Sequence, residues 1–412
     1  MSEDAKPRRV IEVHRGIIGP AAPRPTTIRP RTIDDYPNLP AAYREVAQKL
    51  SSPLLMGPPI CDELVAFVQH LLTEDEAAVV RYLSPVRGKT AGQVARKAGR
   101  PLDQIAPILE RLALTKRVVG SDGSSEKRRY QLLPVMPGIF EMVLVTETPD
   151  TLSDWHRKFI ELFEALYETG YVAAFNQHPT RTIRYLPVDR ALDVHPMALP
   201  SDHMEAVFDR FKVFGLGQCQ CRTTMAALGH GCGKPLANCM AMGDWAVMGI
   251  HHGWLQKVER REALEIKREA ESRGLVNFVI NVESARSQVS CSCCGCCCKA
   301  MRTMSEFSAP SLVAPPHFLP AFDDEQCTYC GKCATACPMG ALTLDPSAKS
   351  RRHARERCIG CGVCAVACPR PGTIKMQPVP EYDPPYSSWF SLVAHNAPAM
   401  ARNAWKAWRS RP

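Results

Sequence analysis

Apolar residues recur at helical spacing in three successive segments of the N-terminal third of the chain. Thr73 and Glu76 form a capping-box pattern before an apolar run. Gly99 can end a second helix in the left-handed conformation, and Pro101 suits the first turn of a third. Short apolar runs around a polar turn follow, as expected for a hairpin. The pattern predicts three helices and a hairpin, over residues 73–83, 90–99, 101–114 and 116–133.

Three helices followed by a hairpin resemble a winged-helix module, which we expect over residues 46–145. Such modules often contact DNA through the third helix. Here that helix offers a poor electrostatic match for phosphate, because its polar residues are Asp103, Gln104, Glu110 and Arg111. Suitably basic residues are found only in the hairpin turn, at Lys127, Arg128 and Arg129. We therefore favour a structural or partner-docking role over DNA binding.

The pattern changes to alternating helices and strands over residues 150–300, which predicts a mixed α/β domain. An amphipathic helix is expected over 155–170 and a charged helix over 258–274, each ending at a glycine. Three segments rich in β-branched and aromatic residues predict strands over 182–188, 211–217 and 276–282.

The two ends of the chain differ from the rest. Residues 1–45 contain seven prolines and few large apolar residues, which predicts a disordered arm. Residues 379–412 predict a basic amphipathic tail, whose helix begins at Asn396 with Pro398 in its first turn. One face of that helix is basic and the other carries tryptophan: Arg402, Lys406, Arg409, Trp405 and Trp408. Packing on the protein itself, docking on a partner and peripheral association with the inner membrane all fit this pattern.

Composition places the chain among folded proteins, since 45% of its 412 residues are apolar and 23% are charged. We find no secretory signal and no apolar run long enough to cross a bilayer, so we expect a cytoplasmic protein. The net charge of +9 does not select a partner. Eighteen of the 19 cysteines lie between Cys219 and Cys368. In a reducing compartment, so many thiols predict metal binding or redox chemistry and not disulfides.

Two copies of the pattern C-x2-C-x2-C-x3-C-P stand near the C-terminus. They consist of Cys327, Cys330, Cys333, Cys337 with Pro338, and Cys358, Cys361, Cys364, Cys368 with Pro369. Three cysteines at two-residue gaps allow one tight loop to wrap a compact iron–sulfur core, and the glycines in the runs permit a close backbone approach. Paired zinc sites are disfavoured, because zinc prefers separated C-x2-C pairs.

Residues 317–378 therefore resemble a bacterial-type dicluster ferredoxin domain. The resemblance implies two [4Fe–4S] clusters, with the fourth cysteine of each run ligating the other cluster. One cluster would take Cys327, Cys330, Cys333 and Cys368. The other would take Cys358, Cys361, Cys364 and Cys337. The loop between the runs is unusually basic and fits either a docking patch for an acidic redox partner or a solvated surface, with Lys349, Arg351, Arg352, Arg355 and Arg357.

Ten further cysteines precede this domain, and six of them fall within eight residues. They are Cys219, Cys221, Cys232, Cys239, Cys291, Cys293, Cys294, Cys296, Cys297 and Cys298. Ten thiols could hold one or two further Fe–S clusters, or zinc, or one cluster and a free dithiol. Arg222 could donate to a sulfide or to a substrate carboxylate, whereas His230 fits an ordinary loop residue better than a ligand.

Residues 60–375 as a whole resemble ferredoxin-type iron–sulfur proteins of anaerobic bacteria. Those proteins combine a winged-helix-like start, C-x-C-R and C-C-x-C-C-C segments, and a terminal dicluster domain. The implied fold is α+β and multidomain, and the implied function is electron transfer as a subunit of, or donor to, a redox enzyme complex. Two alternatives stay open: an oxidoreductase with chemistry in the middle domain, and a redox-sensing DNA-binding regulator.

Overall fold

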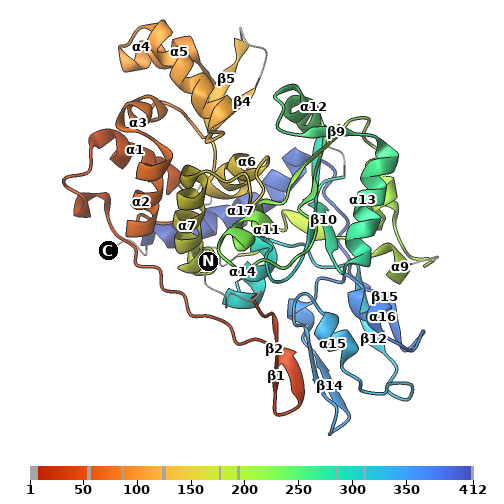
Figure 1. Ribbon diagram of the computed structural model, residues 1–412. Coiled ribbons are helices and arrows are strands. Elements are labelled where there is room, and N and C mark those ends of the chain that lie inside the picture. Colours follow the sequence, from red (N-terminus) through yellow and green to blue (C-terminus); the bar gives the residue numbers. More distant parts are fainter. Residues whose placement is uncertain are drawn as a thin grey trace. The chain divides into compact units, whose positions relative to one another are not determined.

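The computed structural model describes residues 8–52, 57–85, 87–122, 127–175, 178–192, 195–283, 286–309 and 312–409 (Figure 1). The chain forms two compact units. The cysteine unit contains residues 1–25 and 179–398, and the helical unit contains residues 26–178 and 399–412. The sequence predicts a domain boundary between residues 145 and 150; the helical unit extends beyond it to residue 178.

The helical unit is built from helices and one small sheet. Its helices are α1 (Ala41–Leu50), α2 (Asp62–Leu71), α3 (Glu74–Val80), α4 (Ala91–Ala98), α5 (Leu102–Glu110), α6 (Phe140–Leu144), α7 (Asp154–Glu168) and α8 (Tyr171–Phe175). The sheet has the order β3 (Lys89–Thr90), β5 (Arg129–Leu132), β4 (Val119–Asp122). Ring contacts between α2, α6 and α7 form its aromatic core, which includes Phe67, Phe140, Phe159 and Phe163. This packing explains why α7 belongs to the helical unit.

The helix signals of this unit are present in the structure. Thr73 caps α3 in a capping box with Glu76, and Thr90 caps α4 in the same way with Gln93. Gly99 ends α4 with φ +63°. The predicted hairpin is formed by β4 and β5, and the short strand β3, which the sequence pattern does not reveal, pairs with β5.

Glu76 joins three parts of the helical unit although its side chain is only 2% exposed. Its carboxylate accepts hydrogen bonds from Lys116 Nζ at 2.7 Å, Arg111 Nη2 at 3.0 Å and the Thr73 backbone N–H at 2.9 Å. Burial opposes ionisation, but the bonds from Lys116, Thr73 and Arg111 outweigh it and lower the pKa of Glu76. The ionised carboxylate therefore stabilises the fold.

Replacing Glu76 with glutamine is expected to lower the free energy of unfolding of the helical unit by about 2–3 kcal/mol, because two cations lose a buried partner. The contribution is present above the ordinary glutamate pKa and is lost as pH falls through the lower folded-state pKa. Urea denaturation followed by circular dichroism at pH 7 and in acid measures both effects. Glu161→Gln, which removes an exposed pair with Lys158, is the control and should change stability by less than about 0.5 kcal/mol. Equal losses in the two variants would contradict this role.

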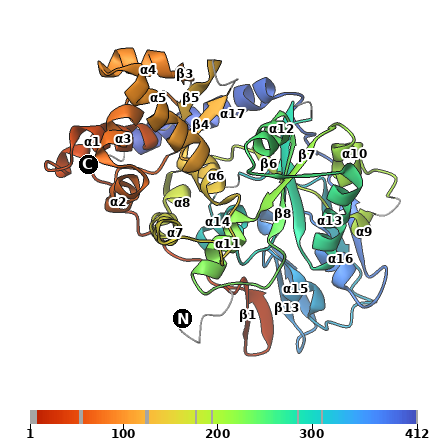
Figure 2. The same ribbon diagram turned by 45° about the horizontal axis from the view of Figure 1, so that its top comes forward.

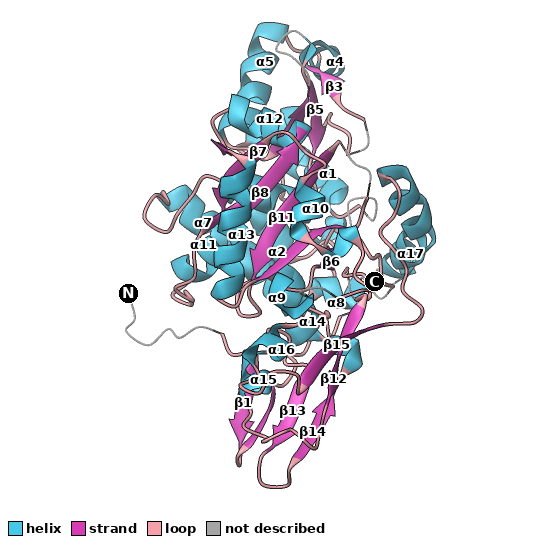
Figure 3. Ribbon diagram, turned by 90° about the vertical axis from the view of Figure 1, so that its right-hand side faces the viewer, coloured by secondary structure: helices cyan, strands magenta, loops and turns pink. Residues whose placement is uncertain are grey.

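A six-stranded antiparallel sheet forms the centre of the cysteine unit (Figure 3). Its order is β6 (Ile183–Tyr185), β10 (Val276–Ile280), β11 (Ser287–Cys293), β8 (Ala237–Gly243), β7 (Phe214–Gln218), β9 (Gln256–Val258). Helices associated with it are α9 (Asp189–Leu192), α10 (Met204–Phe208), α11 (Gln220–Ala227), α12 (Asp244–His251), α13 (Arg260–Ser272) and α14 (Lys299–Phe307). The predicted strands correspond to β6, β7 and β10; β8, β9 and β11 are additional.

The two faces of this sheet carry different chemistry, because successive side chains of a strand point to opposite sides. On one face, Phe214, Met240 and Val279 share an apolar cluster with residues of α10 and α13. The register places Cys291 opposite Phe278, and Phe278 opposite Tyr185, on the other face. That second face is the thiol face.

The segment with the two cysteine runs packs on the thiol face. It contains β12 (Phe318–Phe322) paired with β15 (Ile374–Pro378), the short helices α15 (Lys332–Ala336) and α16 (Val363–Ala367), and the hairpin β13 (Leu342–Asp345) with β14 (Ser350–His353). One apolar cluster contains Tyr185, Cys293, Met339 and Cys361 together. The predicted middle and C-terminal domains therefore share a core within one unit.

Part of the predicted disordered arm is ordered structure. Strands β1 (Ile11–His14) and β2 (Ile17–Pro20) form a hairpin, and β2 adds to β13 with Ile18 opposite Leu344 (Figure 2). Arg24 is 3.4 Å from Glu306 of α14 and helps to fix this segment. The prediction of disorder is wrong for these residues, because β1 and β2 pair with each other and β13, far along the chain, pairs with β2. Residues 1–7 lie outside the described part.

The final helix, α17 (Trp389–Arg409), begins earlier than the sequence predicts. Ser388 Oγ accepts a hydrogen bond from the Ser391 backbone N–H at its start. Asn396 does not cap the helix: its side chain is buried and donates to the Leu392 carbonyl. Trp405 is exposed, whereas the side chains of Lys406, Trp408 and Arg409 lie outside the described residues. Among the helices that are described, none is long and apolar enough to cross a membrane.

Candidate metal centres

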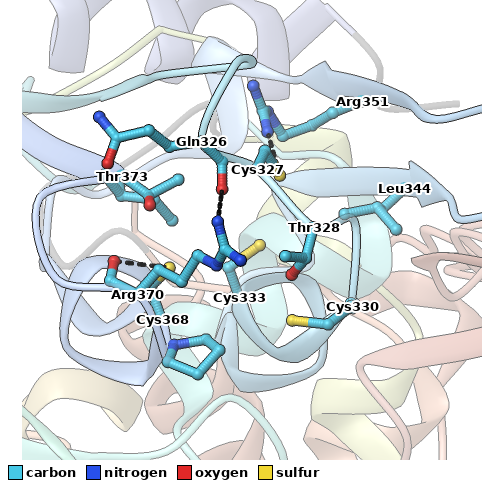
Figure 4. Close-up of a pocket in the computed structure, with 13 residues that line it drawn as sticks. Gln326, Cys327, Thr328, Cys330, Cys333, Leu344, Arg351, Cys368, Arg370 and Thr373 are labelled. Atoms are coloured by element: carbon cyan, nitrogen blue, oxygen red, sulfur yellow. Dashed lines mark hydrogen bonds between the residues drawn. The ribbon is translucent and has the colours of Figure 1, made fainter.

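Four cysteines from the two runs line one pocket (Figure 4). Three come from the first run and the fourth is the last cysteine of the second run: Cys327, Cys330, Cys333 and Cys368. We call them the outer quartet, because Cys330 is exposed. The set is the one that the resemblance to dicluster ferredoxins implies for one cluster.

Local backbone structure explains how the outer quartet converges. Gly331 precedes α15 with φ +79°, a conformation that favours glycine, and this turn separates Cys330 from Cys333. Cys368 follows α16, and the chain segment that leaves the second run holds it close to the cysteines of the first run. Arg370 Nη1 donates to the Gln326 carbonyl at 3.4 Å, which ties this exit to the start of the first run.

Arg351 also faces this pocket, although the sequence shows it only as part of a basic loop. Its Nη1 donates to Cys327 Sγ at 3.5 Å, and its guanidinium lies 3.9 Å from the ring centroid of Phe322. It also pairs with Asp324, and its side chain is only 7% exposed. The sulfur of Cys327 is therefore next to a buried positive charge.

The other four cysteines of the runs form the inner quartet, Cys337, Cys358, Cys361 and Cys364. Cys361 interacts electrostatically with Cys337 and Cys358, and Cys364 interacts with the other three thiols of the quartet. Burial raises the pKa of Cys358 to about 11 and that of Cys361 further. These thiols stay protonated at neutral pH without a metal, so metal binding must release their protons. The Ala341 backbone N–H already donates to Cys337 Sγ at 3.2 Å.

A third set of cysteines, the tight quartet, joins the loop after α11 to the turn after β11. It consists of Cys232, Cys294, Cys296 and Cys297, whose sulfur atoms all lie within 4.8 Å of one another. Cys294 and Cys297 are buried and the other two are half-buried. Hydrogen bonds from Cys294, Cys296 and Cys297 lower the pKa of Cys232, which favours a thiolate there.

The remaining six middle cysteines, the sheet thiols, gather around the thiol face: Cys219, Cys221, Cys239, Cys291, Cys293 and Cys298. Cys239 hydrogen-bonds with Cys291, and Cys298 with both Cys221 and Cys293. The hydroxyl of Tyr185 lies 3.6 Å from Cys298 Sγ. Tyr185 was not expected at a site, and only the strand register reveals it.

Two buried cations lie beside the middle cysteines. Lys267 of α13 donates to the carbonyls of Asn238 and Ser290 at 3.0 and 2.8 Å. Arg222 donates to the Ser292 carbonyl at 2.8 Å and hydrogen-bonds with Cys294. Burial lowers the pKa of Lys267 to about 8, and the nearby thiols oppose that shift. Buried positive charge next to thiols favours their thiolate form.

His230, which we expect from the sequence to be an ordinary loop residue, does not join these groups. His230 follows α11, where its backbone N–H donates to the Met225 carbonyl at 2.7 Å. Within the described residues, it is not part of the group of close metal-ligand side chains. The thiols are thus the donors that the middle segment brings together.

Residues 319–369 match the family model of the 4Fe-4S dicluster domain. The matched segment includes all eight cysteines of the outer and inner quartets. It leaves out the tight quartet and the sheet thiols. No curated protein and no solved structure matches the chain.

Proposed function

We propose that the chain is an electron-transfer protein that holds two [4Fe–4S] clusters, one in the outer and one in the inner quartet. The observation that carries the proposal is the position of Cys368, which lines the same pocket as three cysteines of the first run. Four thiols are the donor set that such a cluster requires. When bound, each cluster accepts and releases single electrons at a low potential.

The surrounding residues adapt the two quartets to different tasks. Cys330 is exposed, so the outer quartet faces a partner, whereas burial of Cys361 and Cys364 insulates the inner quartet. Of the basic loop, Lys349, Arg352 and Arg355 are exposed. These three cations support docking of an acidic redox partner next to the outer quartet.

The inner quartet shares an apolar cluster with sheet thiols, and this contact favours a second candidate function. Cys337, Cys358 and Cys361 belong to the same cluster as Cys291, Cys293 and Cys298. A redox group on the sheet thiols would lie directly beside the inner quartet. The chain would then be an oxidoreductase with substrate chemistry in its middle segment.

The helical unit has the element order expected of a winged helix, with α3, β3, α4, α5, β4 and β5 in succession. Arg128 in the hairpin pairs with Glu110 at 3.3 Å, and residues 123–126 lie outside the described part. This ion pair neutralises one of the basic side chains of the hairpin within the unit itself. It therefore argues against a DNA-binding regulator. We propose that the unit docks the chain on a partner in the cytoplasm, with α17 as an additional contact to protein or to the inner membrane.

Metal and sulfide analysis of anaerobically purified protein tests the proposal. About eight irons and eight sulfides per chain, with an EPR signal after dithionite reduction, are expected. Iron clearly above eight would support a further cluster on the middle cysteines. A chain with zinc in place of iron and without sulfide would refute the electron-transfer function.

Replacing Arg351 with methionine is expected to lower the midpoint potential of the outer cluster by on the order of 50 mV, because a buried cation favours the more negative reduced state. An EPR-monitored redox titration measures the shift. Arg352→Met is the matched control, because Arg352 is the next residue and is exposed. An equal shift in both variants would show that only the net charge matters, and would contradict a specific role of Arg351.

A further inference from the structure

The tight quartet differs in size from the other cysteine groups. Cys232 and Cys294 have their sulfur atoms 4.0 Å apart, and those of Cys296 and Cys297 are 3.7 Å apart. All four sulfurs lie within 4.8 Å of one another. Four ligands at about 2.3 Å from one tetrahedral ion are separated by about 3.8 Å. The observed spacing is therefore that of ligands around a single ion.

A [4Fe–4S] core does not fit in the same space. Four irons and four sulfides must lie between its cysteine sulfurs, so these must be farther apart than the ligands of one ion. The outer and inner quartets provide an internal comparison. Across the described residues, neither of them meets the 4.8 Å limit that the tight quartet meets. The spacing of the sulfur atoms thus distinguishes the tight quartet from the outer and inner quartets of the same chain.

The local backbone of the tight quartet is that of a metal-binding turn. Cys294 and Cys297 have the C-x2-C spacing common in structural zinc sites. The backbone N–H groups of Cys297 and Cys298 donate to the Cys294 carbonyl at 3.4 and 3.1 Å. Gly295 is needed within this turn, because a Cβ atom there would lie 1.9 Å from the Pro338 carbonyl oxygen.

Hydrogen-bond donors that stabilise thiolates surround the quartet. The backbone N–H of Lys234 donates to Cys232, and the side chain of Arg222 donates to Cys294. Met225, Ala270 and Leu275 enclose the buried sulfurs in an apolar cluster. A site with four protein ligands, second-layer donors and an apolar surround leaves no position for a substrate, as in structural metal sites.

We propose that Cys232, Cys294, Cys296 and Cys297 bind one zinc ion in a closed structural site. Binding converts four thiols to thiolates and releases their protons, with no change of oxidation state. The same donors could take a single iron ion, but zinc is the tighter-binding metal of the two. This site goes beyond the proposed electron transfer and does not depend on it.

The zinc site would fix the turn after β11 against the C-terminal segment. Gly295 contacts the residue that follows Cys337 of the inner quartet, and it also lies close to Val10 before β1. Cys298, next in the chain, belongs to the sheet thiols. The ion would therefore hold together three segments that surround the inner quartet without joining its chemistry.

Metal analysis of the full-length protein, purified anaerobically from cells supplied with both iron and zinc, tests the site. One zinc per chain is expected in addition to the cluster iron, with four sulfur neighbours at about 2.3 Å by zinc X-ray absorption. In Cys232→Ser and Cys297→Ser, bound zinc should fall about tenfold or more, while iron and sulfide stay unchanged. Cys61→Ser is the matched control, since Cys61 is a buried thiol of the helical unit whose capping role serine can keep.

A measurement on the unaltered protein keeps the test decisive if the serine variants do not fold. Protein expressed with cobalt in place of zinc should show the intense absorption of a tetrahedral cobalt–thiolate centre. Zinc absent and iron raised by about four per chain would overturn the proposal in favour of a cubane. One sulfide-free iron in this site would overturn the choice of zinc. The sulfide content distinguishes these outcomes, because a further cubane adds about four sulfides to those of the two proposed clusters and a single ion adds none.

Discussion

Replacing Cys368 with serine is expected to remove about four of about eight irons, and the lost cluster is the one held mainly by the first cysteine run. Cys368 lies at the end of the second run, but it lines the pocket that contains Cys327 and Cys333. A cluster that loses one of four thiolates in a half-open pocket is exposed to water and to oxidation. The cluster in the buried inner quartet keeps all its ligands.

Two double variants test the same assignment of ligands even if a single serine substitution does not release the cluster. Cys333→Ser with Cys368→Ser removes two ligands of one quartet, so about four irons should remain, as in the single variant. Cys333→Ser with Cys337→Ser removes two neighbours of one run that belong to different quartets, so both clusters should be lost. Iron, sulfide and the EPR signal of the reduced protein are the measurements. The reverse order of losses would show that each run holds its own cluster.

Local signals determine those parts of the fold that the sequence reveals well. The capping boxes at Thr73 and Thr90 and the left-handed Gly99 depend on residues a few positions apart, and all three are present. The spacing of the two cysteine runs is equally local. Neither signal needs knowledge of the distant chain.

Strands β8 and β11 show what a local pattern leaves out. Their sequences, ANCMAMG and SQVSCSC, are rich in small residues and thiols, and poor in the β-branched and aromatic residues that mark strands. They become strands because neighbours in the sheet pair with them. For the same reason, the gathering of the sheet thiols on one face is visible only in the structure.

The roles of single side chains depend on register in the same way. Arg351 pairs across the hairpin with Leu344, and directly opposite residues of an antiparallel pair lie on the same face. Leu344 lines the pocket of the outer quartet, so Arg351 must face it too. The sequence shows five basic residues in this loop and offers no way to tell the inward arginine from its exposed neighbours.

Lys267 offers a comparable test for the middle segment. Its ammonium group is buried and donates to Asn238 O, Ser290 O and, at 3.3 Å, to Ser292 Oγ. These partners are neutral, while the charges that favour its protonated form come from Cys291, Cys239 and Cys293. A buried cation is stable only if nearby negative charge compensates it. A metal bound by several thiolates would supply that charge.

Replacing Lys267 with glutamine or with methionine separates charge from hydrogen bonding. If the sheet thiols bind a metal as thiolates, both variants are expected to lose it, because glutamine can keep hydrogen bonds but not the charge. Metal beyond the iron of the two clusters and the single zinc should then fall to background, and the free energy of unfolding should fall by about 3–5 kcal/mol. Thermal unfolding and metal analysis of the full-length protein measure the two effects.

Lys257→Met is the control, because that side chain is 65% exposed and its loss should change neither quantity. Glutamine that restores full stability and metal content would show that Lys267 acts only through its hydrogen bonds. If the unaltered protein also holds no metal beyond the two clusters and the single zinc, the oxidoreductase alternative loses its support. If both substitutions remove metal and Lys257→Met does not, the buried positive charge on the opposite side of the sheet is a requirement of a metal centre on the thiol face, and the chain holds metal beyond its two C-terminal quartets and the tight quartet.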